Sequence, residues 1–125
     1  MTTANPSKVL VLDDEALIAF DLAETVADLG CEVVGPAITL KEGFELADAE
    51  EPDLALLDIN IAGDVVWPLA AHLAEKGCEL VFISADVNHR KVCDKFSRSP
   101  LIEKPASPER IARAIEEARD MRVDA

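Results

Sequence analysis

The stretch that decides the fold lies near the N-terminus and reads Val9-Leu10-Val11-Leu12-Asp13-Asp14. Four consecutive apolar residues that end on two carboxylates are typical of a short strand buried on both faces, as in a parallel sheet. Carboxylates are costly at the end of a buried strand unless other polar groups gather around them. We therefore expect partners for Asp13 and Asp14 elsewhere in the chain.

Later apolar runs also end on polar groups. They are Leu54–Leu57 before Asp58, Leu80–Ile83 before Ser84 and Ala85, and Leu101–Ile102 shortly before Lys104. If these runs are neighbouring parallel strands, their carboxyl ends meet at one edge of the sheet, where ligands bind in open α/β folds. The sequence therefore predicts one pocket with three acids and one amine.

Strand and helix candidates alternate along the whole chain. The expected strands are Val9–Leu12, Val33–Val34, Leu54–Leu57, Leu80–Ile83 and Leu101–Ile102. The segments between and after them place apolar residues at helical spacing, with the weakest pattern over residues 86–96. Thr39 with Glu42 fits a capping box, and Ser107 before Pro108 marks another helix start. This alternation predicts a three-layer α/β fold with right-handed crossovers.

Composition narrows the class of protein. A chain of 125 residues, half of them apolar, suits one globular domain. We expect a flexible N-terminus over residues 1–7, one domain over residues 8–122 and no further domain. Without an apolar run of ~20 residues or a signal-peptide pattern, no membrane association and a cytoplasmic location are expected. A net charge of −13 argues against nucleic-acid binding, and the three unpaired cysteines argue against a thiolate metal site.

The three acids need a counter-charge, because closely spaced carboxylates cannot all stay ionised alone. Magnesium is the natural choice, since it prefers hard oxygen ligands and keeps several waters. We expect Asp14 and Asp58 as direct ligands and Asp13 bound through water or a hydrogen bond. The backbone carbonyl of Asn60 is close enough in sequence to Asp58 to reach the same ion.

A metal-bound aspartate with one free oxygen is a nucleophile toward phosphorus, so Asp58 is the expected phosphoryl acceptor. Phosphoryl transfer depends mainly on positioning and charge neutralisation. Magnesium would take one phosphoryl oxygen and the Lys104 ammonium a second. The Ser84 hydroxyl and the Ala85 backbone N–H would take the third.

These residues, in this order, resemble the receiver domain of bacterial two-component response regulators over roughly residues 8–119. The matching motifs are Asp13-Asp14-Glu15, Leu56-Leu57-Asp58-Ile59-Asn60, Phe82-Ile83-Ser84-Ala85 and Glu103-Lys104-Pro105. The resemblance implies a flavodoxin-like, doubly wound five-stranded parallel sheet of order 2-1-3-4-5 with five helices. It also implies that a sensor histidine kinase, docking on the helix before Gly30, transfers its phosphoryl group to Asp58. The face formed by the fourth helix, fifth strand and fifth helix would then shift.

Two positions depart from the usual receiver pattern. Leu101 stands where the family commonly has an aromatic residue that swings inward with the hydroxyl, so the resemblance does not carry that coupling over to this chain. Ala62 replaces a frequent proline in the loop after Asp58, while Gly63 keeps the glycine. This loop, with Trp67-Pro68 after it, is similar to single-domain alphaproteobacterial regulators that work with HWE-type kinases. A monomer or weak dimer is expected.

Three functions stay open from the sequence. The first is a phosphoacceptor, not an enzyme with a separate substrate, that signals through an unidentified protein or drains phosphoryl groups from a kinase. The second is a magnesium-dependent, aspartyl-phosphate phosphatase of the dehalogenase type. Its second acid would stand two residues after the nucleophile, which the adjacent pair Asp13-Asp14 does not match. The third is a receiver-like docking module that is never phosphorylated.

Overall fold

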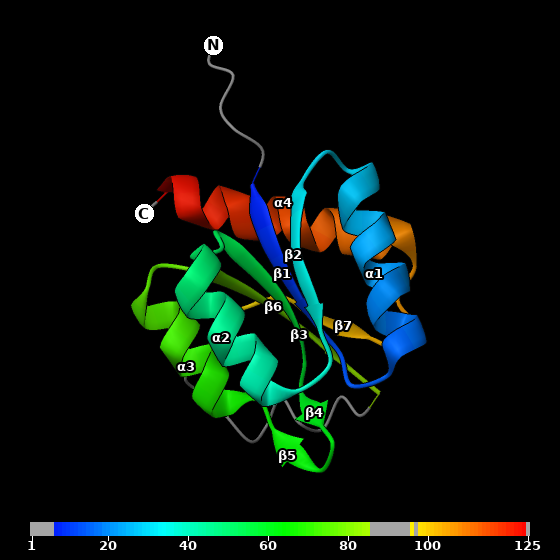
Figure 1. The fold of residues 1–125 in the computed structure, drawn as a ribbon. Coiled ribbons are helices and arrows are strands. Elements are labelled where there is room, and N and C mark those ends of the chain that lie inside the picture. Colours follow the sequence, from blue (N-terminus) through cyan, green and yellow to red (C-terminus); the bar gives the residue numbers. More distant parts are fainter. Residues whose placement is uncertain (1–6, 86–95, 97, 125) are drawn as a thin grey trace.

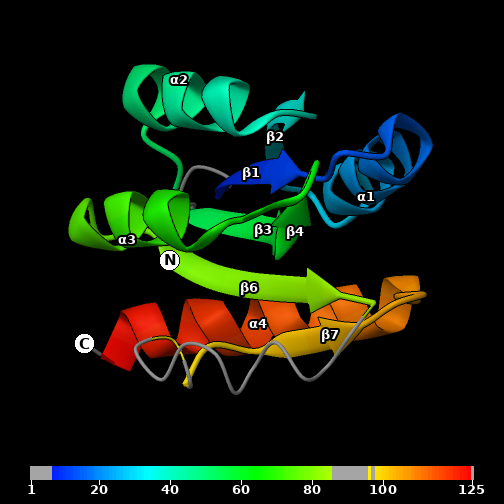
Figure 2. The same cartoon turned by 90° about the horizontal axis from the view of Figure 1, so that it is seen from below.

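The sheet at the centre of the molecule has five parallel strands (Figure 1). The computed structural model describes residues 7–85, 96 and 98–124, with side chains up to residue 120. The strands of the sheet are β1 (Lys8–Leu12), β2 (Glu32–Ala37), β3 (Leu54–Asp58), β6 (Glu79–Ser84) and β7 (Leu101–Glu103). They are stacked in the order β2-β1-β3-β6-β7, as Figure 2 shows from top to bottom. The predicted doubly wound order 2-1-3-4-5 is therefore confirmed.

Within the described residues, four helices cover the two faces of this sheet. They are α1 (Ala16–Asp28), α2 (Leu40–Glu50), α3 (Trp67–Glu75) and α4 (Pro108–Asp124). Apolar residues of α2 and α3 pack with one face of the strands, and those of α1 and α4 pack with the other. In Figure 1, α2 and α3 lie beside one another and α4 crosses behind the strands. The predicted three-layer arrangement is confirmed.

The described residues contain one helix fewer than the five expected. The missing one was expected over residues 86–96, which lie outside the described residues except for Phe96. Among the helices that are described, none has the length and apolar character required to cross a bilayer.

The two helix starts expected from sequence are confirmed. Thr39 Oγ1 accepts a hydrogen bond from the backbone N–H of Glu42 at 3.1 Å. The Glu42 carboxylate in turn accepts from the backbone N–H of Ile38 at 2.9 Å, which completes a reciprocal cap. At the start of α4, Ser107 Oγ accepts from the backbone N–H of Arg110 at 3.2 Å. Local side chains therefore set where these two helices begin.

A small hairpin after β3 was not expected from sequence. It pairs β4 (Asn60–Ile61) with β5 (Asp64–Val65) in antiparallel fashion. The two turn residues both have positive φ, 53° at Ala62 and 91° at Gly63, as in the tight turns that suit the twist of a hairpin. Strands of two residues are too short to show an alternating pattern, so the sequence contains little signal for them.

Close packing between α2 and α3 makes Gly43 sensitive to substitution. A Cβ at this position would lie 2.7 Å from Leu69 Cδ2, and Leu69 is fully buried. Gly43→Ala would ordinarily favour the helix by ~1 kcal/mol. We expect a net loss in the free energy of unfolding of about 1–2 kcal/mol, because overpacking outweighs helix propensity here. Urea denaturation measures this, with Glu45→Ala on the exposed side of α2 as a near-neutral control. A stabilised Gly43→Ala variant would contradict the packing described.

Candidate functional site

The residues expected at the strand ends gather at one edge of the sheet. A cleft of about 390 Å³ is lined by Asp14, Glu15, Asp58, Asn60, Ser84, Ala85 and Lys104. Six of these lining residues were expected in the site from sequence, whereas Glu15 appeared there only as part of a matching motif. Asp13 does not line the cleft because its side chain is fully buried. Parallel strands produce this grouping, since β1, β3, β6 and β7 all end at the same edge.

Lys104 joins two of the acids. Its Nζ lies 3.0 Å from Asp58 Oδ2 and 3.1 Å from Asp13 Oδ2. The first contact is a hydrogen bond, whereas the second is an ion pair without hydrogen-bond geometry. Burial acts to lower the pKa of Lys104, but its contacts with Asp58 and Asp13 outweigh burial and raise it. The amine therefore stays charged and holds the two carboxylates together.

Asp13 and Asp14 have different surroundings although they are adjacent. Asp13 Oδ1 accepts a hydrogen bond from the backbone N–H of Glu15 at 2.9 Å, beside its contact with Lys104. Asp14 is exposed, and its Oδ2 accepts from the backbone N–H of Ala62 at 2.8 Å. Asp14 thus ties the tip of the β4–β5 hairpin to the end of β1. The sequence places Ala62 in the loop after Asp58 but contains no signal for this contact across 48 positions.

Asp58 is the most electrostatically perturbed acid of the cleft. Its residue is 5% exposed, and its Oδ1 accepts from the backbone N–H of Asn60 at 3.3 Å. Burial, with a smaller contribution from the charge of Asp13, raises the pKa of Asp58 to about 6, against the opposing effect of Lys104. Because the charged form of Asp58 is disfavoured in the folded protein, added positive charge in the cleft would stabilise it.

The raised pKa of Asp58 predicts a pH dependence of stability. Because the folded protein binds this proton more tightly than the unfolded chain, the protonated form contributes stability below pH 3.8. That contribution is lost as the pH rises toward about 6. Relative to Asp58→Asn, which does not titrate, the wild type should therefore lose roughly 2–3 kcal/mol between pH 4 and pH 7. Urea denaturation with a chelator present measures the difference.

Asp28→Asn, at the exposed end of α1, is the matched control for this pH dependence. Its stability curve should run parallel to that of the wild type. If the free energies of unfolding of the wild type and Asp58→Asn instead changed with pH in parallel, folding would not raise the pKa of Asp58.

The acids of the cleft are close enough to share a cation. One carboxylate oxygen each from Asp13, Asp14 and Asp58 lie within 4.8 Å of one another. An all-oxygen donor set with one exposed member suits a hard divalent cation that retains waters. Asn60, next but one to Asp58, lines the same cleft. Because the Lys104 ammonium also lines the cleft, the cleft can hold both a cation and an anion.

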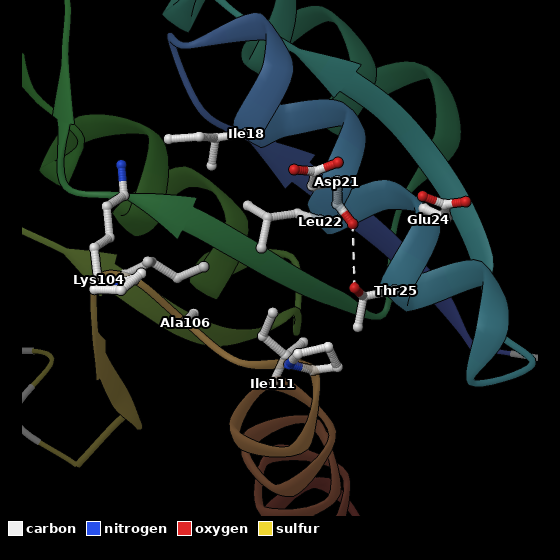
Figure 3. A pocket seen from close by; sticks show the side chains of 11 residues that line it. Ile18, Asp21, Leu22, Glu24, Thr25, Lys104, Ala106 and Ile111 are labelled. Atoms are coloured by element: carbon white, nitrogen blue, oxygen red, sulfur yellow. Dashed lines mark hydrogen bonds between the residues drawn. The ribbon is translucent and has the colours of Figure 1, made fainter.

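A second, larger pocket adjoins this cleft (Figure 3). It has a volume of about 590 Å³ and lies between α1 and the segment from Lys104 to the start of α4. Ile18 and Leu22 on α1 face Ile111 on α4 across it, and Asp21 and Glu24 lie along α1, as Figure 3 shows. Lys104 lines both pockets, so anything seated beside α1 approaches the acid cluster.

Helix α1 also exposes large apolar side chains next to this pocket. Leu17 is 82% exposed and Phe20 is 62% exposed, the two highest values among the large apolar residues described. Because Leu17 and Phe20 stand three positions apart, their side chains lie on the same face of α1 and form one exposed apolar patch.

Comparison with known proteins agrees with this geometry. Residues 9–116 match the family model described as the response regulator receiver domain. The chain is 33% identical over 92 residues to the transcriptional regulatory protein PdtaR of Mycobacterium tuberculosis, which covers 74% of this chain and 45% of that protein. It is 31% identical over 115 residues to the phyllosphere-induced regulator PhyR of Methylorubrum extorquens, covering 90% of this chain and 43% of PhyR.

Among solved structures, the PhyR receiver domain of Erythrobacter litoralis superposes with a TM-score of 0.79 at 26% identity. That match covers 93% of this chain and 92% of the other. The chain spans less than half the length of the two curated relatives, so the match concerns only part of each of them. The strand order, the acid cluster and the family match lead to one conclusion: this chain belongs to the response regulator receiver domain family.

Proposed function

We propose that the chain is the phosphoacceptor of a two-component system and that Asp58 accepts the phosphoryl group with Mg²⁺. The observation that supports this most strongly is the Lys104 Nζ at 3.0 Å from Asp58 Oδ2, beside three clustered carboxylates. Residues 8–122 would act as the receiver, signalling through another protein or draining phosphoryl groups from a kinase. On this view the protein is no enzyme with a separate substrate.

Each residue of the cleft has a role in the proposed transfer. An oxygen of Asp58 attacks phosphorus while the P–N bond to the kinase histidine breaks, and the leaving nitrogen keeps the electron pair and takes a proton from water. Lys104 neutralises one phosphoryl oxygen, and the Ser84 hydroxyl with the Ala85 backbone N–H binds another. Bound magnesium supplies further positive charge to offset the phosphoryl oxygens.

The proposed magnesium ligands are the carboxylates of Asp14 and Asp58 and the backbone carbonyl of Asn60. Asp13 would join through water or a hydrogen bond. The close approach of the three carboxylate oxygens fits this assignment. The charge of the ion would offset the cost of ionising the buried Asp58.

The proposed partner is a sensor histidine kinase that docks on α1 in the cytoplasm. Leu17 and Phe20 supply exposed apolar area, and the adjoining pocket lies next to Lys104. A kinase helix seated there brings its phosphohistidine to the mouth of the acid cleft. The loop after Asp58, with Trp67-Pro68 following it, favours a kinase of the HWE type.

Asp14→Ala should weaken magnesium binding by about tenfold or more, because it removes an exposed carboxylate ligand. It also removes the acceptor for the Ala62 N–H at the hairpin tip. Titration with Mg²⁺, followed by the fluorescence of Trp67, measures the affinity. The control is Asp64→Ala, on the β4–β5 hairpin but outside the cleft lining, which should keep the wild-type affinity for Mg²⁺. Unchanged affinity in Asp14→Ala would remove Asp14 from the ligand set.

The proposed function is tested by a phosphotransfer profile. Each sensor kinase of the source organism is autophosphorylated and mixed with the chain and Mg²⁺. We expect rapid transfer from one or a few kinases to a hydroxylamine-sensitive acyl phosphate on this chain. Failure with every kinase and with acetyl phosphate would refute the phosphoacceptor role. Steady release of phosphate from an excess of a phosphomonoester would instead support the phosphatase alternative.

A further inference from the structure

Three aromatic rings form a closed cluster on the α3 side of the sheet. Trp67 and Phe82 are in an edge contact with centroids 5.4 Å apart, and Trp67 stacks on Phe96 at 5.9 Å. Phe82 and Phe96 close the triangle at 5.6 Å. We call these three residues the aromatic triad. Because each ring touches the other two, displacement of one must be accommodated by the others.

The triad is connected to the acceptor cleft in two ways. Phe82 lies two residues before Ser84 on β6, so both side chains project from the same face of that strand. Trp67 is the first residue of α3 and follows the hairpin whose tip is bound to Asp14 through Ala62. A change at either Ser84 or the hairpin therefore reaches one ring of the triad directly.

The third ring lies where the chain approaches β7. The backbone carbonyl of Phe96 accepts a hydrogen bond from the backbone N–H of Ser99 at 3.1 Å. The carbonyl of Pro100, which follows Ser99, accepts one from the backbone N–H of Phe82 at 2.9 Å. Leu101 pairs with Phe82 across β6 and β7 and packs against the same core cluster. Residue 101 is not aromatic, but it lies directly beside the aromatic triad.

The position of the Trp67 ring depends on packing. Its Nε1 is buried and has no hydrogen-bond partner among the residues that the structure describes. A buried N–H without an acceptor is unfavourable, so the observed ring position gains nothing from hydrogen bonding and is held by packing alone. A ring held only by packing shifts when its neighbours in the triad move.

We propose that the aromatic triad, in place of a ring at position 101, transmits phosphorylation of Asp58 to Phe96. Movement of Ser84 and of the hairpin shifts Phe82 and Trp67, and Trp67 changes its stacking on Phe96. This inference rests on the proposed phosphoacceptor function and names how the acceptor site is read out. It makes Phe96 a positioning residue that is not needed for phosphoryl transfer.

The test uses Trp67 itself, which is the only tryptophan of the chain. Its emission spectrum and acrylamide quenching are recorded for the full chain with Mg²⁺ alone and with Mg²⁺ plus acetyl phosphate. Mass spectrometry of the same samples measures the fraction of Asp58 that is modified. We expect an emission change that rises with that fraction and is absent in Asp58→Asn.

The matched variants are Phe96→Leu and Phe44→Leu. Phe44 contacts His72 at 5.3 Å and lies outside the triad. Phe96→Leu should reach the same modified fraction as the wild type but lose at least half of the emission change, whereas Phe44→Leu and Phe96→Tyr should keep it. A full change in Phe96→Leu would overturn the proposal, because it would show that Trp67 senses the phosphoryl charge directly.

Two further outcomes separate this inference from the proposed function. Complete modification of Asp58 in the wild type with an unchanged Trp67 spectrum would overturn the triad proposal alone, even if no variant folds. No modification of Asp58 under any condition would overturn the phosphoacceptor function on which it rests.

Discussion

Asp58→Asn should abolish covalent labelling of the chain by acetyl phosphate and Mg²⁺, down to background. The amide that replaces the carboxylate is no nucleophile toward phosphorus. The other carboxylates do not replace it, because Asp13 is fully buried against Lys104 and Asp14 is bound to the hairpin tip. Intact-mass spectrometry, together with sensitivity of the adduct to hydroxylamine, measures the labelled fraction.

The asparagine variant should stay folded, which makes loss of labelling interpretable. Its side-chain oxygen can still accept from Lys104, as Asp58 Oδ2 does at 3.0 Å. Asp28→Asn, at the far end of α1 from the cleft, is the control and should label like the wild type. Full labelling of Asp58→Asn would place the acceptor on another residue and refute the proposed role of Asp58.

Lys104→Met should lower the free energy of unfolding by about 3 kcal/mol in magnesium-free buffer, because it leaves two buried carboxylates without their cation. Lys104 Nζ is within 3.1 Å of both Asp13 and Asp58. Added Mg²⁺ should recover part of the loss by supplying positive charge to the same acids. Urea denaturation with a chelator and then with Mg²⁺ measures both effects.

A second lysine shows what an exposed ion pair contributes. Lys76 Nζ lies 3.5 Å from Asp48 Oδ1 on the surface, so Lys76→Met should cost under about 1 kcal/mol. The double variant Asp58→Asn with Lys104→Met should lose less than the Lys104→Met variant alone, because one of the stranded charges is gone. Equal losses for the Lys104 and Lys76 variants would contradict the buried bridge.

Lys104→Met should also separate phosphorylation from its consequences. Asp58 keeps its nucleophilic oxygen, so acetyl phosphate with Mg²⁺ should still label the variant, though more slowly. Without the ammonium there is no group to draw the phosphoryl oxygens toward β7, and partner binding should no longer respond to labelling. A normal response to phosphorylation in this variant would refute the coupling role of Lys104.

The sheet and the membership of the cleft were predictable because they depend on local pattern. Short apolar runs buried on both faces read as parallel strands, and parallel strands end at a common edge. This was enough to name Asp14, Asp58, Ser84 and Lys104, which the structure places around one cleft. The helix expected over residues 86–96 lies outside the described residues except for Phe96, so that prediction stays open.

Other features depend on which side chains meet in space. The sequence by itself determined an α/β fold with parallel strands and the polar residues at the strand ends, because strand and helix periodicity act over a few neighbouring positions. Only the tertiary structure decided that Asp13 pairs with Lys104, that Asp14 holds the Ala62 amide, and that three distant rings form the aromatic triad. Such contacts join segments tens of residues apart, and their geometry is set by packing of the whole core.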